Sequence, residues 1–251
     1  MGEFYDDILR RLAARGILQP EMSILVCCGG GVDRDAFQRQ GFRNVLISNI
    51  HRLDPSEFAP YRFSAQDVER LALADEAFDA CVVHSGLHHC RSPHAALLEM
   101  YRVAAKAVLV IEPFATPLSR LGAWLGFGQE YEHQAVTAQG GGVANTAIPN
   151  YVYRWTRQEI RKTISSFAPH ARHRILFFQG LDIHWGSLRG RKSRWPYALM
   201  LAGYPLLRAC HLCFPRLTSN SFAAVILKPA LPADLQPWVS AANGTVAQKT
   251  G

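Results

Sequence analysis

The sequence predicts an α/β protein built on a mostly parallel sheet, and two observations carry this prediction. First, 251 residues, of which 49% are hydrophobic and 19% charged, suffice to bury the core of a sizeable domain. Second, short apolar runs rich in Val, Ile and Leu alternate with helical patterns, which is typical of βαβ units. The expected strands are residues 23–28, 45–49, 78–83, 107–112, 174–179 and 221–228.

Three helix boundaries are marked by residues with known capping behaviour. A helix over 33–40 ends before Gly41, a residue that favours helix termination. Ser92 and Pro93 predict an N-cap and a first helical residue. Thr156, followed three residues later by Glu159, predicts a capping box that opens a helix ending near Phe167.

We interpret residues 1–251 as one domain made of consecutive segments. A short amphipathic helix is expected near the N-terminus, and a Gly-containing stretch after the strand expected at 107–112 is expected to cover a ligand site. The segments are an N-terminal helix in 1–20, a ligand-binding half in 22–113, a lid insertion in 114–155, a C-terminal half in 156–230 with a helical insertion in 193–214, and a flexible tail in 231–251.

Charge and hydropathy limit the class of partner without choosing one. With 27 basic and 20 acidic residues the net charge is +7, which permits nucleic acid, anionic lipid or an acidic substrate. No apolar run reaches the roughly 18 residues of a membrane helix, so we expect a soluble, cytoplasmic protein with no membrane span. The apolar stretch 195–214 is interrupted by Pro205, and we expect a buried or substrate-facing helix there rather than a membrane contact.

The six cysteines predict reduced thiols rather than a disulfide framework. Cys27 and Cys28 are adjacent in sequence, which suits no ordinary disulfide. Cys210 and Cys213 form a C-x-x-C without a second pair at metal-ligand spacing, so we expect two buried thiols and no metal.

Three consecutive glycines follow the first expected strand in ILVCCGGGVD. Gly29, Gly30 and Gly31 allow a ligand to approach the backbone and expose helix N-terminal amides, which predicts a nucleotide-like ligand. The last glycine of G-x-G-x-x-G is missing, and no P-loop Lys follows. A tight turn without a ligand is the alternative interpretation.

The order of the later segments resembles a class I S-adenosylmethionine-dependent methyltransferase of the small-molecule type, over residues 22–113. The segment FDACVVHSGLHHC at 78–90, with the helix and strand after it, carries most of this resemblance. It implies a Rossmann-like sheet with helices on both faces and a C-terminal antiparallel hairpin. It also implies S-adenosylmethionine as cofactor, S-adenosylhomocysteine as product and no metal.

The resemblance also implies a set of cofactor-binding residues. Asp67 takes the place of the adenine-binding acid, and Asn49 stands where the family usually has a ribose-binding acid. Two further departures are Val26, in place of the usual acid in the first strand, and Cys28, in place of the first glycine of the turn. The expected cofactor-binding residues are Cys28, Gly29, Gly30, Gly31, Asn49, Ile50, Asp67, Val68, His84 and Ser85.

Candidate catalytic groups follow the fourth and fifth strands of the family pattern. An imidazole titrates near neutral pH and can remove a proton from the methyl acceptor. His88 is expected to face the substrate more than His89, with Glu112 orienting it and His133 as a second candidate base. The expected walls of the acceptor pocket are Tyr131, Tyr151, Tyr153 and Arg154.

The resemblance therefore implies methyl transfer to a hydroxyl or amine of a small molecule, such as a sugar, a natural product or a related metabolite. Methylation of a nucleic-acid base is disfavoured because the segment HSGLHH replaces an N-P-P-Y-like run. A non-catalytic or RNA-directed protein of the same fold is the alternative, a dehydrogenase ranks third, and a homodimer is possible. The identity of the acceptor is not specified by the sequence.

Overall fold

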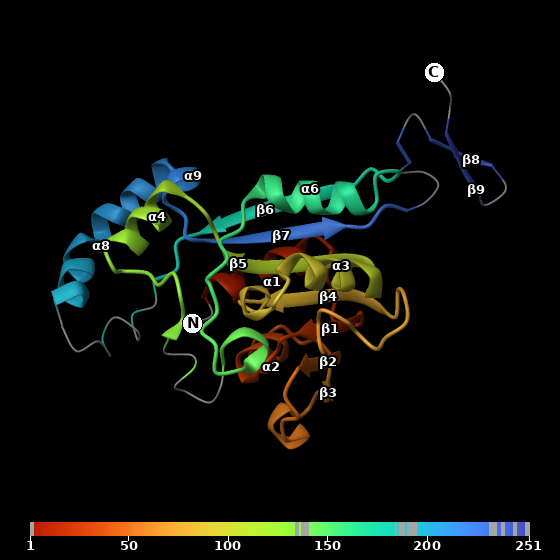
Figure 1. Ribbon diagram of the computed structural model, residues 1–251, viewed down its shortest axis with the longest axis horizontal. Coiled ribbons are helices and arrows are strands. Elements are labelled where there is room, and N and C mark those ends of the chain that lie inside the picture. Colours follow the sequence, from red (N-terminus) through yellow and green to blue (C-terminus); the bar gives the residue numbers. More distant parts are fainter. Residues whose placement is uncertain are drawn as a thin grey trace.

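A seven-stranded sheet forms the centre of the molecule, with strand order β3-β2-β1-β4-β5-β7-β6 (Figure 1). The computed structural model describes residues 3–133, 136, 141–183, 185, 189, 195–230, 235–236, 239–242 and 245–248. The strands are β1 Ser23–Cys27, β2 Asn44–Asn49, β3 Arg62–Ala65, β4 Phe78–His84, β5 Ala104–Pro113, β6 Arg174–Gly180 and β7 Ser221–Leu227.

The direction of the strands confirms the predicted fold class. All pairings among β1 to β5 are parallel, whereas β7 runs antiparallel to both β5 and β6, which places it between them. Parallel strands require crossover connections, and helices supply them. The ends of the parallel strands therefore meet at one edge of the sheet, where open α/β folds bind ligands.

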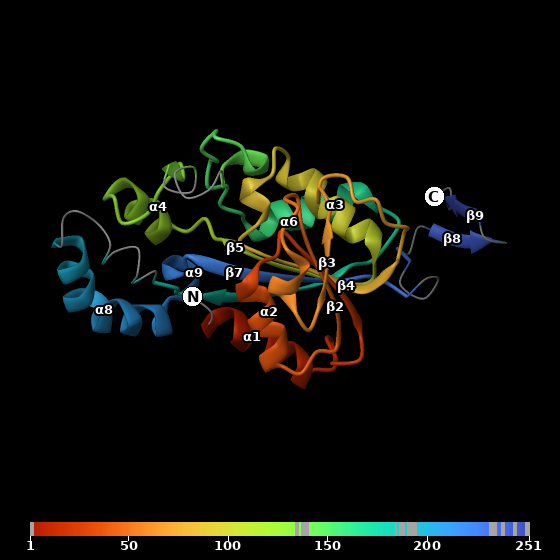
Figure 2. The same cartoon turned by 90° about the horizontal axis from the view of Figure 1, so that it is seen from below.

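Helices cover both faces of the sheet, each over its own hydrophobic cluster (Figure 2). On one face lie α3 (Pro93–Val103) and α6 (Arg157–Phe167), and on the other lie α1 (Glu3–Ala14) and α2 (Gly31–Arg39). Because successive strand residues point to opposite faces, Cys81 packs in the cluster under α3 and Val82 in the cluster over α1.

The predicted helix caps are present. The Ser92 hydroxyl accepts a hydrogen bond from the Ala95 amide at 3.3 Å, and Pro93 opens α3. Thr156 and Glu159 form the reciprocal capping box of α6. Gly41, with φ of 76°, follows α2 in the left-handed conformation that other residues adopt at a cost. These local signals fix where the helices begin and end.

Three strands were not predicted. β3 is a half-exposed edge strand whose sequence RFSA has no apolar run, so no periodicity indicates it. In the expected flexible tail, β8 (Val239–Ala242) pairs antiparallel with β9 (Thr245–Gln248). The dipeptide Asn243-Gly244 between them is a common hairpin sequence and was the available signal.

The inserted segments carry the remaining helices. The expected lid contains α4 (Pro117–Trp124) and the 3₁₀ turn η3 (Val143–Asn145), and two further short turns are η1 (Pro55–Phe58) and η2 (Leu87–His89). Gly140 of the expected lid lies outside the described residues, as do residues 193–194 of the expected helical insertion and much of 231–251.

The helical insertion, predicted to be buried or substrate-facing, is not buried, although Met200 and Leu207 line a cavity described below. It forms α8 (Trp195–Cys213) and α9 (Pro215–Thr218), which contact each other beyond the edge of the sheet, and α8 leaves much of its apolar surface exposed. Cys213 is exposed and Cys210 half-buried, so the expected pair of buried thiols is wrong. Within the described part of the chain, no helix combines the length and hydropathy needed to span a membrane.

Candidate active site

Two cavities open at the carboxyl edge of the parallel strands. The smaller, of about 220 Å³, lies beside the ends of β1, β2 and β4. The larger, of about 580 Å³, extends from the ends of β4 and β5 into the inserted segments. Among the described residues, Ser85 lines both cavities and no other residue does. Ser85 directly follows β4, so the two cavities meet at the end of the central strand.

The smaller cavity contains most of the residues predicted to bind the cofactor. The predicted residues that line it are Cys28, Asn49, Ile50, Asp67, Val68 and Ser85. Residues from the expected lid also line it, namely Gly141, Ala144 and Asn145. Gly29, Gly30 and Gly31 are next to Cys28 in sequence but are absent from the lining.

Two glycines near this cavity lie where neighbouring side chains leave no room for a Cβ atom. A Cβ on Gly29 would lie 2.7 Å from Ile47 Cγ2, so this position has no room for a side chain. A Cβ on Gly86 would lie 2.5 Å from the Cβ of Cys28. The turns after β1 and β4 are therefore in close contact at Gly86. Cys28 itself has φ of 54°, a conformation that favours glycine.

Asn49 uses its side-chain amide within the protein. Its Nδ2 donates to the Gly29 carbonyl at 3.1 Å, and its Oδ1 accepts from Asn145 Nδ2 at 3.2 Å. Asp67 is exposed and accepts a hydrogen bond from the Glu69 amide through Oδ1. A ligand that uses Asn49 Oδ1 must therefore compete with Asn145, whereas the carboxylate of Asp67 is accessible.

His84 does not line the smaller cavity and faces the larger one instead. The reason is strand alternation, since His84 continues the side of β4 that carries Val82 and packs towards α1. There its ring stacks on Tyr5, with ring centroids 4.4 Å apart. The prediction that His84 lies among the cofactor-binding residues is corrected accordingly.

Glu112, at the end of β5, is almost fully buried and binds the turn that follows β4. Its Oε1 accepts hydrogen bonds from the amides of Gly86 at 2.8 Å and Leu87 at 2.7 Å. Its Oε2 lies 2.7 Å from His88 Nδ1. Because a carboxylate accepts, Nδ1 of His88 carries the hydrogen and Nε2 is left facing Glu132 at 3.7 Å.

The two adjacent histidines have opposite electrostatic environments. Burial lowers the pKa of His88, but the charge of Glu112, the hydrogen bond to it and the charge of Glu132 outweigh burial, so this pKa is raised. Burial lowers the pKa of His89, and the neighbouring His88 lowers it further. Near neutral pH, His89 is therefore the imidazole that is free to accept a proton.

The two rings differ in their access to the cavities. His89 lines the smaller cavity, whereas His88 lines neither cavity. The 3₁₀ turn of η2 places Leu87 and His88 towards the interior and leaves His89 half-buried. His89 Nε2 lies 3.4 Å from an oxygen of Glu132, which lines the larger cavity.

His88, His89 and Glu132 also form a group with metal-ligand chemistry. Their ligand atoms lie within 4.8 Å of one another. A second-sphere carboxylate such as Glu112 commonly orients a metal-binding histidine. The same three groups are equally suited to sharing a proton, because the Nε2 atom of each histidine faces an oxygen of Glu132, at 3.7 Å from His88 and 3.4 Å from His89.

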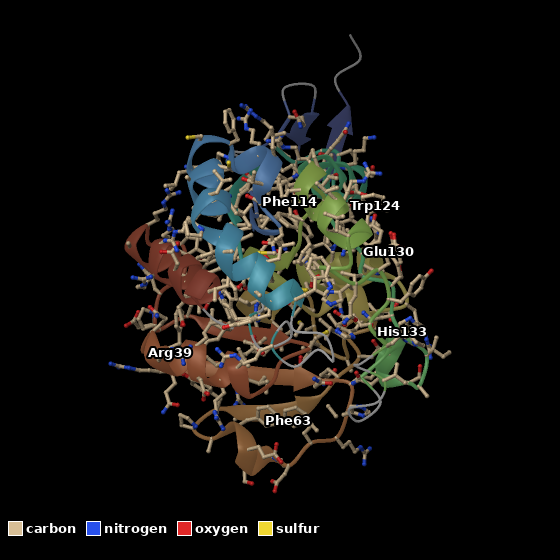
Figure 3. All side chains as sticks on the ribbon, turned by 90° about the vertical axis from the view of Figure 1, so that its left-hand side faces the viewer. Arg39, Phe63, Phe114, Trp124, Glu130 and His133 are labelled. Atoms are coloured by element: carbon tan, nitrogen blue, oxygen red, sulfur yellow. The ribbon has the colours of Figure 1, made fainter. Side chains whose placement is uncertain are left out.

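The other predicted residues lie in different places. His133, labelled in Figure 3 at the edge of the molecule, is exposed, and the nearly half-exposed Tyr131 and Tyr151 line neither cavity. The Tyr153 hydroxyl donates to Glu159, and burial with this contact raises the pKa of Tyr153 to about 12. Of the four predicted wall residues, Arg154 alone lines the larger cavity.

Sequence reasoning missed Glu132 and the apolar walls of the larger cavity. Glu132 precedes His133, the residue that was chosen in the same QEYEHQ run, so a carboxylate beside a candidate histidine was the available signal. The apolar lining includes Leu118, Leu121 and Leu125 around α4, and Met200 and Leu207 on α8. Nothing in their spacing distinguishes a cavity wall from an ordinary helix face.

Residues 25–111 match a family model described as a methyltransferase domain. No curated protein sequence matches the chain. An S-adenosylmethionine-dependent methyltransferase from Archaeoglobus fulgidus superposes with a TM-score of 0.52 at 12% identity, covering 89% of this chain and 94% of that one. The magnesium protoporphyrin IX methyltransferase of Synechocystis PCC 6803, solved with S-adenosylhomocysteine, gives 0.50 at 14% identity, with 89% and 81% covered.

The chain has the class I S-adenosylmethionine-dependent methyltransferase fold. The resemblance seen over residues 22–113 is thereby confirmed. Similarity in this methyltransferase fold extends to another reaction, since the 4+2 cyclase SpnF superposes with a TM-score of 0.53 at 14% identity, covering 90% of this chain and 81% of that one. The reaction must therefore be argued from the two cavities.

Proposed function

We propose that the protein transfers a methyl group from S-adenosylmethionine, bound in the smaller cavity, to a hydroxyl or amine of a small molecule bound in the larger cavity. The observation that carries this proposal is the meeting of the two cavities at Ser85, beside a proton-accepting group. Methyl transfer needs the acceptor atom about 3 to 3.5 Å from the methyl carbon and in line with it. Two cavities that share one wall suit this requirement.

The residues around the smaller cavity fit the cofactor. The accessible carboxylate of Asp67 lies beside the buried Val68 and the partly exposed Ile50, a combination that can accept from an amino group and pack against a ring. Asn49 offers an amide to ribose hydroxyls after Asn145 is displaced. When bound, the cofactor supplies an electrophilic methyl group on a sulfonium.

We assign the proton transfer to His89. Its lowered pKa keeps the ring neutral near pH 7, and its Nε2 faces Glu132 at the boundary between the cavities. His88 has a positioning role, because Glu112 fixes both its ring and the backbone of the turn that carries His89. Glu132 can stabilise the imidazolium that forms when His89 accepts a proton.

The pH dependence of the transfer rate tests this assignment. A base must be neutral to act, so activity falls as pH drops through its pKa. If His89 is the base, the acidic limb lies below the ordinary imidazole range, because the pKa of His89 is lowered. If His88 is the base, the limb lies above that range, because the pKa of His88 is raised.

Substitution provides a second test. His89→Ala should lower the rate of methyl transfer by roughly 10²- to 10⁴-fold and remove the acidic limb, with calorimetric titration of S-adenosylmethionine reporting cofactor affinity separately. His133→Ala is the matched control, since this histidine is exposed and lines neither cavity. Full turnover by the His89 variant would mean that the reaction needs proximity alone, as for an amine that arrives unprotonated.

A second candidate function is binding without methyl transfer. Val26, Cys28 and Asn49 depart from the residues usual in the family, and Asn49 Oδ1 is occupied by Asn145. The same calorimetric titration separates the two candidates. Absence of binding at millimolar S-adenosylmethionine would reject the methyltransferase proposal.

We retain the proposal that the insertion 114–155 acts as a lid. Both cavities take wall residues from it, including Asn145 at the smaller cavity and Leu121 at the larger. Hydrogen exchange should show protection of this segment when cofactor is added. Equal exchange with and without cofactor would contradict a lid.

A further inference from the structure

Three helices at one end of the molecule expose a concentration of large apolar side chains. In Figures 1 and 2, α4, α8 and α9 lie together at the end opposite the β8–β9 pair. Figure 3 views this end, with α8 in the foreground and Trp124 beside it. The most exposed of these side chains are Trp124 at 81%, Leu212 at 78%, Leu206 at 71%, Trp195 and Phe214 at 60%, and Leu201 at 54%.

This apolar surface carries positive charge and no acid. Arg120, Arg208 and Arg216 are exposed on α4, α8 and α9 respectively. The sequence contains no Asp or Glu between residues 114 and 129 or between residues 183 and 228. Exposed apolar side chains combined with Lys and Arg are the composition of segments that lie in the headgroup region of anionic bilayers.

Charge also argues against a second copy of the chain as the occupant. A twofold contact would place this surface against itself and bring its arginines together without acidic partners. A bilayer with anionic headgroups supplies the missing negative charge and accepts Trp and Leu side chains at the same time. The helices need not cross the bilayer, and none that the structure describes is suited to do so.

The surface is continuous with the larger cavity. Leu121 and Leu125 line the cavity from around α4, while Met200 and Leu207 line it from α8. One polar group of this cavity, Glu132, lies near the strand ends, 3.4 Å from His89 Nε2. An amphiphile entering from the helices would place its apolar body between them and its polar head next to His89.

We propose that α4, α8 and α9 dock on an anionic membrane surface and that the methyl acceptor is a membrane-dissolved amphiphile taken up between α4 and α8. The docking surface comprises the exposed apolar residues named above together with Arg120, Arg208 and Arg216. The acceptor class rests on the proposed function, whereas membrane docking does not depend on it.

Vesicle sedimentation of the full chain tests docking. The protein should sediment with vesicles of equal phosphatidylglycerol and phosphatidylcholine, and about tenfold or more weakly with phosphatidylcholine alone. The double variant Leu206→Glu/Leu212→Glu should lose binding by about tenfold or more, because both side chains are exposed and would place charge in the bilayer. Ile148→Glu/Leu53→Glu is the matched control, with the same charge change at exposed positions outside the surface.

Several outcomes would overturn docking. These are failure of the wild-type chain to sediment with anionic vesicles, equal sedimentation of the Leu206→Glu/Leu212→Glu variant, and a dimer in analytical ultracentrifugation that this variant abolishes while vesicles bind neither form. The last outcome would reassign the surface to self-association. Circular dichroism spectra must match among the variants, so that lost binding is not lost folding.

An alkyl-chain probe tests the acceptor class. 4-Nonylphenol should bind by fluorescence titration at concentrations where phenol does not, and Leu207→Arg should abolish that binding while leaving S-adenosylmethionine affinity unchanged. Equal binding of phenol and 4-nonylphenol would overturn the amphiphile class. Vesicle binding without any S-adenosylmethionine binding would reject the proposed function and leave docking intact.

Discussion

The two cavities are built by different means. The smaller takes most of its walls from residues that follow β1, β2, β3 and β4, where glycines permit close contact, and, among the described residues, only three from the inserted segment. The larger takes most of its walls from segments inserted after β5 and β6, including α4 and α8. Under the proposed function, cofactor binding would depend mainly on the sheet, whereas acceptor choice would depend on helices attached to its edge.

The largest effect is expected at the residue that supports the junction between the cavities. Glu112→Ala would leave the buried amides of Gly86 and Leu87 and the ring of His88 without their acceptor. Loss of one partner of a buried charged network costs about 3–5 kcal/mol, which chemical denaturation would measure. Glu112→Gln should cost less, because its Oε1 can still accept from both amides. Equal losses for the two variants would contradict this account.

The next effect concerns the close contact between strand ends. Gly86→Ala would place a Cβ 2.5 Å from Cys28 Cβ and should destabilise the fold by about 1–3 kcal/mol. Gly203→Ala is the control, since nothing lies within 4 Å of a Cβ built at this position of α8. Thermal unfolding measures both. If the two variants unfold at the same temperature, the smaller cavity is less rigid than its contacts indicate.

The affinity for S-adenosylmethionine should depend on residues of the smaller cavity such as Asp67. Asp67→Ala should weaken S-adenosylmethionine binding by about 1–3 kcal/mol in calorimetry, the cost of leaving a ligand donor unpaired. Fold stability should change little, because Asp67 is exposed. Asp54→Ala is a control at an exposed carboxylate outside both cavities. Unchanged affinity in Asp67→Ala would move the adenine site elsewhere.

The smallest effect is expected in the wall of the larger cavity. Leu125 is 50% exposed, so Leu125→Ala should change the free energy of unfolding by no more than about 0.5 kcal/mol. The substitution should nevertheless weaken binding of 4-nonylphenol, because Leu125 lines the cavity. A large loss of stability would show that the inserted helices belong to the core and would remove the contrast between the two regions.

The same division explains how much could be predicted from the sequence. Strands such as β4 contain a run of apolar residues and helices such as α3 have clear caps, so physical rules that act over a few residues specify them. The exposure of α8 could not be predicted, because an apolar helix pattern has the same sequence signature in a core and at an interface. Its lack of acidic residues was visible, but net charge alone selects no partner.

At the site, the residues that lie near the cavities were easier to predict than the directions in which their side chains point. Six cofactor candidates line one cavity because short turns after parallel strands leave their residues at one edge. The sequence does not specify which of His88 and His89 is buried, because one 3₁₀ turn decides which ring faces inward. Glu132 reaches both rings from a distant insertion, and contacts between segments 43 residues apart have no local signature.

The antiparallel position of β7 has a consequence for how the acceptor-binding half can change. Gly180, the last residue of β6, pairs directly with Ser221, the first residue of β7, so the ends of the intervening segment are held together by the sheet. Replacing that segment adds little loop-closure entropy, because each doubling of loop length costs only about 0.6 kcal/mol. The sheet therefore tolerates changes in the length of this segment, because the pairing that holds its two ends does not depend on what lies between them.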